Sequence, residues 1–283
     1  MKASGSTKPA IASPSRRPRK RADGAPLPSW RAGAAYLYAL QLDGPSLAWE
    51  YLRRNPEYRY DWYSEPRDPT RFITRWGLEL PEDPGRDARV AHPIWRIDPT
   101  SMVRIIADDC DDPTGANRFC LWSIPGRKVL THDGRRLVLT AAHGNGVVRL
   151  AVANDLCDGG RYSYVVRADA NARARLCAVD DYTSRLQAAE PVKPYVVRPR
   201  PGRVAMLHMR ALQALDGVDA RASHRDIAHA VFGDQRAAQE WHPDSELRAQ
   251  VRHLIGRAQA FMRGGYRSLV VNGTGHAQGD ERT

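Results

Sequence analysis

Six apolar residues near the end of the chain recur at the spacing of one helical face, and they constrain the fold more than any other feature. Leu247 is followed by apolar side chains at positions 251, 254, 255, 258 and 262. This spacing places all six on a single stripe that must be buried against other elements. The pattern predicts a long helix that begins at a cap on Asp244 or Ser245 and ends near residue 263.

Polar side chains lie in one arc beside this stripe when successive residues are placed about 100° apart. They are the side chains of Ser245, Arg248, Arg252, Gln259 and Arg263. A helix that docks one face on the protein and presents guanidinium groups on another suits the major groove of DNA, where arginine contacts phosphates and guanine edges. An arginine-rich face is also common on ordinary solvated helices, so the arc alone leaves both interpretations open.

A shorter helix is predicted just upstream. Ser223 stands three residues before Asp226, which is the spacing of a capping box, and Gly233 is placed to end the helix in a left-handed conformation. Another amphipathic helix covers residues 203–215 and ends at an Asp-Gly pair. Together these segments predict a module like a helix-turn-helix. In such a module the first residues of the middle helix contact backbone phosphates, and here they are Ser223, His224 and Arg225.

The connection between the last two helices of this module is longer than the usual turn of about 3–4 residues. It runs from Gly233 to Asp244 and contains Trp241 and Pro243. Two alternatives stay open. Either residues 234–240 form an extra short helix that itself reaches the groove, or the module is not a standard helix-turn-helix.

The charge of the chain is compatible with a polyanionic partner. The 283 residues carry a formal net charge of +11. Residues 1–30 hold seven Lys/Arg against one Asp, and five of the basic residues form one run, Arg16, Arg17, Arg19, Lys20 and Arg21. Such a run can bind phosphates without sequence preference, although basic tails also serve solubility alone. Charge by itself therefore does not decide for nucleic-acid binding.

The sequence predicts an α+β protein with a helical, aromatic-rich N-terminal region, a small antiparallel β section and a C-terminal helix-turn-helix-like helical domain. The expected segments are a disordered basic tail at 1–28, the N-terminal domain at 29–100, the β-rich section at 101–189, a Pro-rich linker at 190–202, the C-terminal domain at 203–271 and a disordered tail at 272–283.

In the N-terminal domain, helical patterns cover 34–42, 45–54 and 58–63, followed by an irregular stretch from 64 to 100. In the β-rich section, short β-branched or aromatic segments separated by turn residues predict strands. These segments are Val103–Ala107, Phe119–Ile124, Lys128–Leu130, Arg136–Ala141, Val147–Ala151 and Tyr162–Arg167. Helices near 150–157 and 169–188 are expected to pack beside them, and residues 264–271 are expected to add a short strand.

Aromatic side chains gather between residues 49 and 63. They belong to Trp49, Tyr51, Tyr58, Tyr60, Trp62 and Tyr63. Stacking on single-stranded bases would require them to be exposed and interleaved with positive charge. The surrounding region is slightly acidic, which favours a core or a protein-interaction surface instead.

Several of these motifs resemble a proteobacterial family of regulators carried by integrative and conjugative elements. The resemblance rests on the residues 223–228, Phe232-Gly233, Trp241, the Leu-Arg and Val-Arg pairs of 247–252 and the Gly-Gly-Tyr-Arg at 264–267, and also on residues 48–58. It covers most of residues 30–270 and is weakest in the middle. It implies a two-domain activator that switches on excision genes, or an antiactivator that binds such an activator, with no catalytic residues to carry over.

An enzymatic alternative is weaker. His132, Asp133 and His143 suggest acid–base chemistry or a metal site, but His132 and Asp133 fall at an expected hairpin turn. The cysteines lack the spacing of zinc ligands, although Cys110 and Cys120 could meet across a hairpin. We therefore expect neither catalysis nor a metal or other cofactor.

The hypothesis from sequence is a cytoplasmic DNA-binding transcriptional regulator that controls excision or transfer genes of a mobile element. Its expected partner is double-stranded DNA, with RNA polymerase or an antiactivator protein as further candidates. No membrane association is expected, because no segment approaches the roughly 20 continuous apolar residues of a membrane helix. The alternative is a protein-binding adaptor or antiactivator that modulates another regulator.

Overall fold

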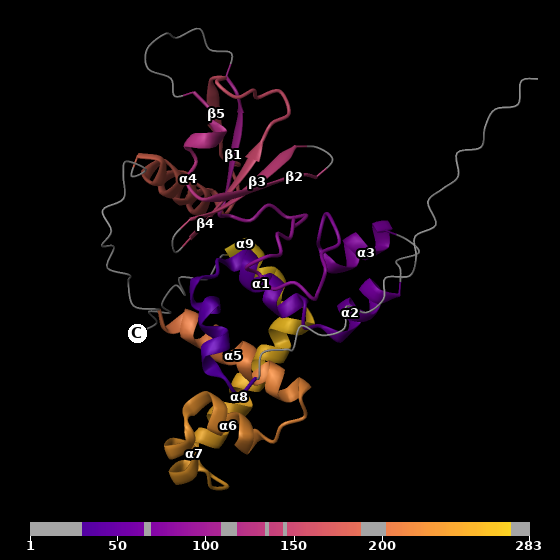
Figure 1. Cartoon of the computed structure of the whole chain (residues 1–283), viewed down its shortest axis with the longest axis vertical. Coiled ribbons are helices and arrows are strands. Elements are labelled where there is room, and N and C mark those ends of the chain that lie inside the picture. Colours follow the sequence, from indigo (N-terminus) through magenta and orange to yellow (C-terminus); the bar gives the residue numbers. More distant parts are fainter. Residues whose placement is uncertain are drawn as a thin grey trace, which may run out of the picture.

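The computed structural model describes residues 30–64, 69–108, 118–133, 136–143, 146–187 and 202–272 (Figure 1). The predicted tails, apart from Asn272, and almost all of the predicted linker lie outside these ranges, as does Cys110. Within the described ranges, no helix combines the length and the hydrophobicity that crossing a lipid bilayer requires.

Helices make up both the N-terminal and the C-terminal parts of the described chain. The N-terminal ones are η1 (Gly33–Gln41), α1 (Gly44–Leu52), α2 (Pro56–Tyr63) and α3 (Pro69–Trp76). The C-terminal ones are α5 (Arg203–Asp219), α6 (His224–Phe232), α7 (Asp234–Glu240), α8 (Glu246–Ala260), the π-helical segment η3 (Phe261–Gly265) and α9 (Tyr266–Asn272). The predicted helices near 34–42, 45–54 and 58–63 are confirmed, whereas α3 was not predicted.

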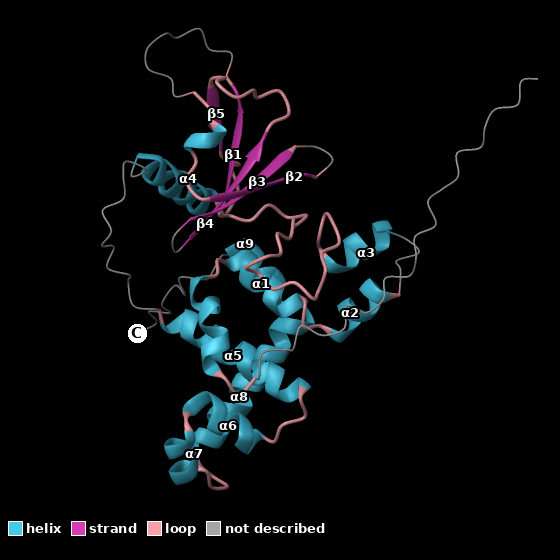
Figure 2. Cartoon of the chain, viewed as in Figure 1, coloured by secondary structure: helices cyan, strands magenta, loops and turns pink. Residues whose placement is uncertain are grey.

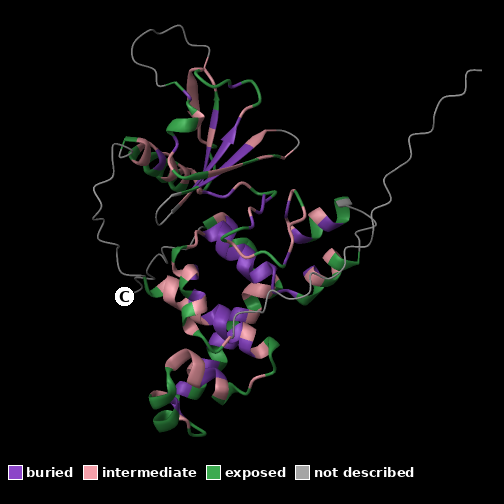
Figure 3. Cartoon of the chain, in the orientation of Figure 1, coloured by how far each residue is buried: buried purple, intermediate pink, exposed green. Residues whose placement is uncertain are grey.

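One hydrophobic core joins these two distant parts of the chain. It contains Trp49 and Tyr51 from α1 together with Leu212 from α5, Val251 from α8 and Tyr266 from α9. Figure 3 shows buried stretches on the helices in the middle of the molecule. The expected domain limits assign these residues to separate domains, but the side chains interdigitate in a single cluster. The C-terminal helices are therefore held in place by the N-terminal ones.

A buried ion network reinforces this junction. The Arg54 guanidinium donates to both carboxylate oxygens of Asp216 on α5 at 2.6 and 2.9 Å, and to Glu50 at 2.5 Å. Tyr36 donates to Asp216 at 2.7 Å, and Arg53 donates to Glu50 at 2.8 Å. Burial would raise the pKa of Glu50, but the two guanidinium groups outweigh it and lower that pKa to about 2.

The aromatic cluster divides between core and surface. Trp49, Tyr51 and Tyr58 are completely buried, with the rings of Trp49 and Tyr58 packed edge to face 5.6 Å apart. Tyr60 and Tyr63 are 71% and 46% exposed. Trp62 is partly buried against the same core, so the core interpretation holds for four of the six residues.

The middle of the chain forms a five-stranded sheet with the order β2-β3-β4-β1-β5 (Figure 2). Its strands are β1 (Met102–Ala107), β2 (Arg127–His132), β3 (Leu137–His143), β4 (Gly146–Val152) and β5 (Tyr162–Val165), and α4 (Ala172–Gln187) packs beside β1. The α+β class is confirmed. The sheet is mixed rather than purely antiparallel, because β1 inserts between β4 and β5 and pairs with β4 in parallel.

Four local predictions are wrong. Residues 119–124 contain the 3-10 turn η2 (Leu121–Ser123) instead of a strand, and the expected helix at 150–157 begins as the end of β4. Residues 266–271 belong to the helix α9, not to a strand. The helix α5 also continues past Asp216 to Asp219, because the Asp216 carboxylate is bound by Arg54 and Tyr36.

The sheet is fastened to the helical body by Arg149. This buried side chain on β4 donates to the carboxylate of Asp43 at 3.0 Å and to the hydroxyl of Ser46 at 2.8 Å. Ile94, Met102, Val138 and Ala151 form a small apolar cluster on the same side of the sheet. These contacts leave α6 and α7 at the end of the molecule farthest from the sheet (Figure 1).

Candidate DNA-binding surface

The start of α6 has the capping geometry that the sequence predicts. The Ser223 hydroxyl oxygen accepts from the backbone N–H of Asp226 at 3.1 Å, and the Asp226 carboxylate accepts from the backbone N–H of Ser223 at 3.1 Å. The Ser223 hydroxyl also donates to the Asp226 carboxylate at 2.6 Å, and this bond, followed by the one from the Ser223 backbone, lowers the pKa of Asp226. The Ser223 hydroxyl is therefore engaged in capping the start of the helix, whereas His224 and Arg225 are exposed beside it.

An extra helix follows after a single residue. Gly233 has a φ of 93° and joins α6 directly to α7, so the extra short helix of the first alternative is present at residues 234–240. The expected positive φ at Gly233 is confirmed, although its ψ of 152° lies outside the left-handed helical region. Such a backbone favours glycine because a Cβ would be strained there.

The surface of α7 carries acidic groups. Asp234 and Glu240 stand at its two ends, and Asp234 contacts His229 at 2.8 Å. Its one arginine, Arg236, donates to Glu240 at 2.9 Å and lies 3.5 Å from Gln250. The positive charge of α7 is therefore balanced by neighbouring carboxylates, which disfavours contact with phosphates.

The long helix α8 has the buried face that its stripe predicts. Leu247, Val251, Leu254, Ile255 and Ala258 are all buried, and the helix packs against α5 and α6. Its N-cap is Ser245, whose hydroxyl oxygen accepts from the backbone N–H of Arg248 at 3.2 Å. Ser245 is 6% exposed, so it is placed to cap the helix and not to meet a ligand.

The residues of the predicted polar arc differ in how far they are exposed. Arg248, Arg252 and Arg263 are exposed, and Gln259 is half-buried. The Arg248 guanidinium has a long contact of 3.4 Å with the carbonyl oxygen of Pro243. Among the described residues, no carboxylate pairs with any of these three arginines. The one acidic residue of α8 is Glu246, which accepts from Gln250 at 2.8 Å.

A second basic edge runs along the other side of the exposed face. It consists of His253 and Arg257, and the Arg257 guanidinium lies 5.6 Å from the centre of the Phe261 ring. A shallow, mainly apolar depression lies between the two edges and is lined by Gly256, Ala260 and Gly265. Arg257 was not among the predicted site residues, although the same 100° spacing places it opposite Arg252 across these small residues.

The far end of α8 is held by the N-terminal helices. The Asn55 amide donates to the carbonyl oxygen of Met262 at 3.0 Å, and the Tyr266 hydroxyl donates to the carbonyl oxygen of Trp76 at 3.0 Å. Arg267 also donates to the carbonyl oxygen of Arg75. These bonds satisfy backbone groups that the π-helical segment and the end of α3 leave open. The exposed face of α8 is thereby fixed relative to the helical body.

A buried histidine lies beneath this end of α8. The Nδ1 atom of His208 is 2.9 Å from the Tyr51 hydroxyl, and the Phe261 ring stacks on Tyr51 with their centres 5.0 Å apart. Burial lowers the pKa of His208 to about 4, with a further contribution from the charge of Arg257. His208 is therefore neutral at pH 7 and contributes a hydrogen bond within the core.

The residues of the enzymatic alternative do not come together. His132 pairs with Leu137 at one end of β3, and His143 is the last residue of that strand. Six residues of strand separate the two positions by roughly 20 Å at about 3.3 Å per residue. Asp133 accepts from the backbone and side chain of Arg136, both at 3.0 Å, and so holds the turn.

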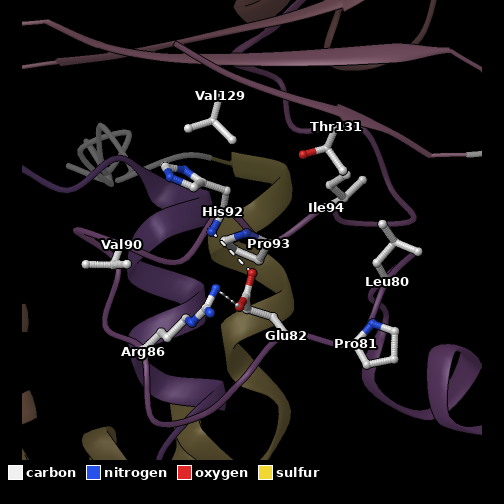
Figure 4. Close-up of a pocket in the computed structure, with 10 residues that line it drawn as sticks. All are labelled: Leu80, Pro81, Glu82, Arg86, Val90, His92, Pro93, Ile94, Val129 and Thr131. Atoms are coloured by element: carbon white, nitrogen blue, oxygen red, sulfur yellow. Dashed lines mark hydrogen bonds and ion pairs between the residues drawn. The ribbon is translucent and has the colours of Figure 1, made fainter. Parts of the chain in front are cut away.

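A small pocket lies between the N-terminal region and the sheet. Val129 and Thr131 of β2 face it from the sheet, and Glu82 and His92 face it from the opposite loop (Figure 4). The Glu82 carboxylate accepts from the backbone N–H of His92 at 3.4 Å and lies 4.0 Å from the Arg86 guanidinium. Both carboxylate oxygens therefore take part in holding the loop.

Three family models match parts of the chain. Residues 165–270 match a family described as "T6SS, Transcription factor, DNA binding domain", and residues 29–81 match a "Proteobacterial transcriptional regulator-like domain". Residues 100–147 match a domain of unknown function. A search of curated proteins finds no match. The chain thus carries a DNA-binding domain of transcription-factor type together with a regulator-like domain, and DNA is its partner.

Proposed function

We propose that the protein is a sequence-specific regulator that acts in the cytoplasm and reads double-stranded DNA with α8. The observation that carries this proposal is the exposed arc of Arg248, Arg252 and Arg263, which no described carboxylate neutralises, on a helix whose opposite face is docked on α5 and α6. Arginine on such a helix recognises guanine through two parallel hydrogen bonds and also binds phosphates.

The charge distribution favours α8 over α7 as the helix that enters the groove. The carboxylates of Asp234 and Glu240 on α7 would face a phosphate backbone at unfavourable distances, and Arg236 is already paired with Glu240. On α8 the small residues Gly256 and Ala260 lie between two basic edges. A groove wall can approach closely there without a steric conflict.

The start of α6 supplies a phosphate contact beside this helix. His224 and Arg225 are exposed in its first turn, where the backbone N–H groups and the helix dipole also favour an anion. Ser223 and Ser245 position the two helices through their caps. Gln259, half-buried beside Arg252 and Arg263, contributes an amide at the edge of the arc.

A double charge reversal tests the proposal. The variant Arg248→Glu/Arg252→Glu should lose its preference for sites selected from genomic DNA and weaken binding by at least about 100-fold, because each reversed charge removes a contact and adds repulsion. The matched control is Arg173→Glu on α4, an exposed arginine far from α8. Unchanged binding and salt dependence in the double variant, with native circular dichroism, would exclude α8 as the recognition helix.

For the regulated genes we propose the excision or transfer genes of a mobile element. The motifs at 223–233 and 264–267 support this proposal through their resemblance to regulators of integrative and conjugative elements. The similarity of residues 165–270 to a transcription-factor family associated with T6SS favours type VI secretion genes as the second candidate. Chromatin immunoprecipitation of the full-length protein would distinguish them, because the two candidates predict binding upstream of different operons.

A protein-binding adaptor is the second candidate function. The observation in its favour is Trp122, which is 78% exposed and lies 5.6 Å from the amino group of Lys128 on the edge strand β2. An exposed tryptophan of this kind is typical of a protein interface. The adaptor function predicts that Trp122→Ala abolishes co-purification with another regulator or with RNA polymerase, and that purified protein shows no preference among DNA sequences.

A further inference from the structure

We propose that the pocket between the loop of residues 80–94 and the strand β2 binds a small neutral molecule with a short hydrocarbon body and one hydrogen-bonding group. All of the residues that line the pocket lie in this loop or on β2. The site is therefore separate from the exposed face of α8 and does not depend on the proposed DNA-binding function.

The loop that forms one wall of the pocket is held in place by the helical body. The backbone N–H of Glu79 donates to the carbonyl oxygen of Ile94 at 2.7 Å, which joins the two ends of the loop. The ring N–H of Trp49 on α1 donates to the carbonyl oxygen of Arg86 in the middle of the loop at 3.0 Å. The opposite wall is a strand of the sheet. The pocket is therefore formed in advance, so a ligand does not have to order it on binding.

The pocket lies at the junction between the helical body and the sheet. Arg149 bridges the same junction through its hydrogen bonds to Asp43 and Ser46. Sites for small molecules occur preferentially where two such parts of a protein meet. A bound molecule would contact the loop and β2 together and would add a second link between them.

The volume of the pocket sets the size of its occupant. It is about 230 Å³, which leaves room for roughly eight non-hydrogen atoms at about 30 Å³ each. Leu80 and Val90 are 41% and 59% exposed, and a short hydrocarbon body would remove part of this surface from water. The full apolar lining consists of Leu80, Pro81, Val90, Pro93, Ile94 and Val129.

Two polar groups in the walls have no hydrogen-bond partner among the described residues. They are the imidazole of His92 and the hydroxyl of Thr131, which lie on opposite walls (Figure 4). Burial, followed by the charges of Arg149 and Arg127, lowers the pKa of His92, so its ring is neutral at pH 7. One ring nitrogen then donates and the other accepts. An amide, ester or hydroxyl group of a ligand can form hydrogen bonds with both residues.

The charges around the pocket favour a neutral occupant over an ion. The Glu82 carboxylate, which accepts from the backbone N–H of His92 at 3.4 Å, would repel an anion. The Arg86 guanidinium lies 4.0 Å from that carboxylate and, together with Arg127 and Arg149 near His92, would repel a cation. A neutral ligand meets the unpartnered imidazole and hydroxyl without either penalty.

The test titrates the full-length protein, labelled with ¹³C at the methyl groups of Leu, Val and Ile, with small probes observed by NMR. The neutral probes are hexanamide, ethyl butanoate and benzyl alcohol, and the charged ones are hexanoate and benzylammonium, each of about eight non-hydrogen atoms. At least one neutral probe should shift the methyl signals of Leu80, Val90, Ile94 and Val129 saturably, with a Kd on the order of 1 mM. The charged probes should bind at least about 10-fold more weakly.

A matched pair of variants locates the site. Val129→Trp should fill the pocket and abolish the saturable shifts. The control is Leu130→Trp on the same strand, because successive side chains of a strand point to opposite faces of the sheet, and it should leave the affinity unchanged. If Val129→Trp loses the native methyl spectrum, Thr131→Val decides, since it keeps the shape of the side chain but removes the hydroxyl. It should weaken binding of the neutral probe by about 2- to 10-fold.

Three results would overturn the proposal. The first is the absence of saturable shifts around the pocket at concentrations up to about 20 mM of every neutral probe. The second is binding of hexanoate or benzylammonium as tight as that of the neutral probes. The third is unchanged binding in a folded Val129→Trp variant or, where that variant is not native, in Thr131→Val. No DNA is present in these titrations, so their failure would leave the function of α8 unaffected.

Discussion

Two groups of arginines show how the same side chain serves opposite purposes in this molecule. Arg53, Arg54 and Arg149 are buried, and each contacts a carboxylate of the helical body. Arg252 and Arg263 project from the helical segment formed by α8 and η3, where no described carboxylate pairs with them. The buried arginines are matched within the fold, whereas the exposed ones remain available for the phosphates and bases of a ligand.

This difference has energetic consequences. A buried ion pair contributes little net stability compared with a well-packed apolar substitute, but removal of one partner leaves an uncompensated buried charge. An exposed arginine without a partner contributes almost nothing to stability, because water solvates it in both the folded and the unfolded chain. Substitution of a buried arginine should therefore lower the stability of the fold, whereas substitution of an exposed arginine should change only DNA binding.

The largest effect is expected at Arg54. Arg54→Ala leaves Asp216 and Glu50 without their guanidinium partner and should lower the free energy of unfolding by about 3–5 kcal/mol. Urea denaturation of the full-length protein at pH 7 measures it. The matched exposed variant, Arg252→Ala, should stay within about 0.5 kcal/mol of the unsubstituted protein. Equal stabilities for the two variants would contradict the comparison.

The role of Arg54 shows what sequence reasoning could not reach. Its partner Asp216 lies 162 positions away, and Asp216 with Gly217 has the local pattern of a helix end. The helix continues because Arg54 and Tyr36 bind the carboxylate and because Gly217 leaves room for Trp30 and Ile227. The Asp-Gly pair therefore predicted the wrong end for α5, because the long-range contact of Arg54 with Asp216 outweighs this local preference.

By contrast, the elements of the candidate site were predictable because their determinants are local. The capping box at Ser223, the cap at Ser245 and the apolar stripe of α8 each involve residues within a few positions of one another. Gly264-Gly265 is the exception within this module. It was expected to begin a strand, but it lies in a π-helical kink instead. The residues on either side of the kink are held by distant partners: Met262 by Asn55, 207 positions away, and Tyr266 by Trp76, 190 positions away.

The next effect in size concerns pH and extends the comparison to a buried imidazole. His208 has its pKa lowered to about 4 from 6.5 by burial and by Arg257, so the unfolded chain binds its proton more readily. Stability should therefore be intact above about pH 6.5 and fall as the pH drops toward 4, by about 1.4 kcal/mol per pH unit and about 3 kcal/mol in total.

His208→Gln checks this assignment, since glutamine retains a hydrogen-bonding group near Tyr51 but does not titrate. Urea denaturation between pH 7 and pH 4.5 should show a shallower loss of stability in the variant than in the unsubstituted protein. His92, whose pKa is also lowered by burial, contributes to the loss in both proteins. Glu50, with its pKa near 2, contributes only below about pH 4.5. Parallel curves would show that His208 does not titrate as described.

A smaller effect distinguishes base reading from phosphate contact at the exposed Arg252. Arg252→Lys keeps the positive charge but loses the two parallel donors that recognise guanine. Affinity for non-specific DNA and the salt slope should stay unchanged, while the preference for the selected site falls by about 5- to 160-fold, equivalent to about 1–3 kcal/mol. Competition gel-shift assays at one salt concentration measure this ratio. An unchanged preference would assign Arg252 to phosphate contact instead of base reading.

The smallest effect is expected on α7 and sharpens the contrast between paired and unpaired arginines. Glu240→Gln removes the carboxylate that Arg236 contacts at 2.9 Å and so frees one guanidinium next to α8. If α7 only flanks the groove, DNA affinity should rise by no more than about 2- to 5-fold, in line with the few tenths of a kcal/mol to 1 kcal/mol of a surface ion pair. Arg236→Gln should conversely leave affinity nearly unchanged. If Arg236→Gln instead lowers DNA affinity as much as the α8 variants do, α7 and not α8 occupies the groove, because only direct contact with DNA makes a paired arginine indispensable for binding.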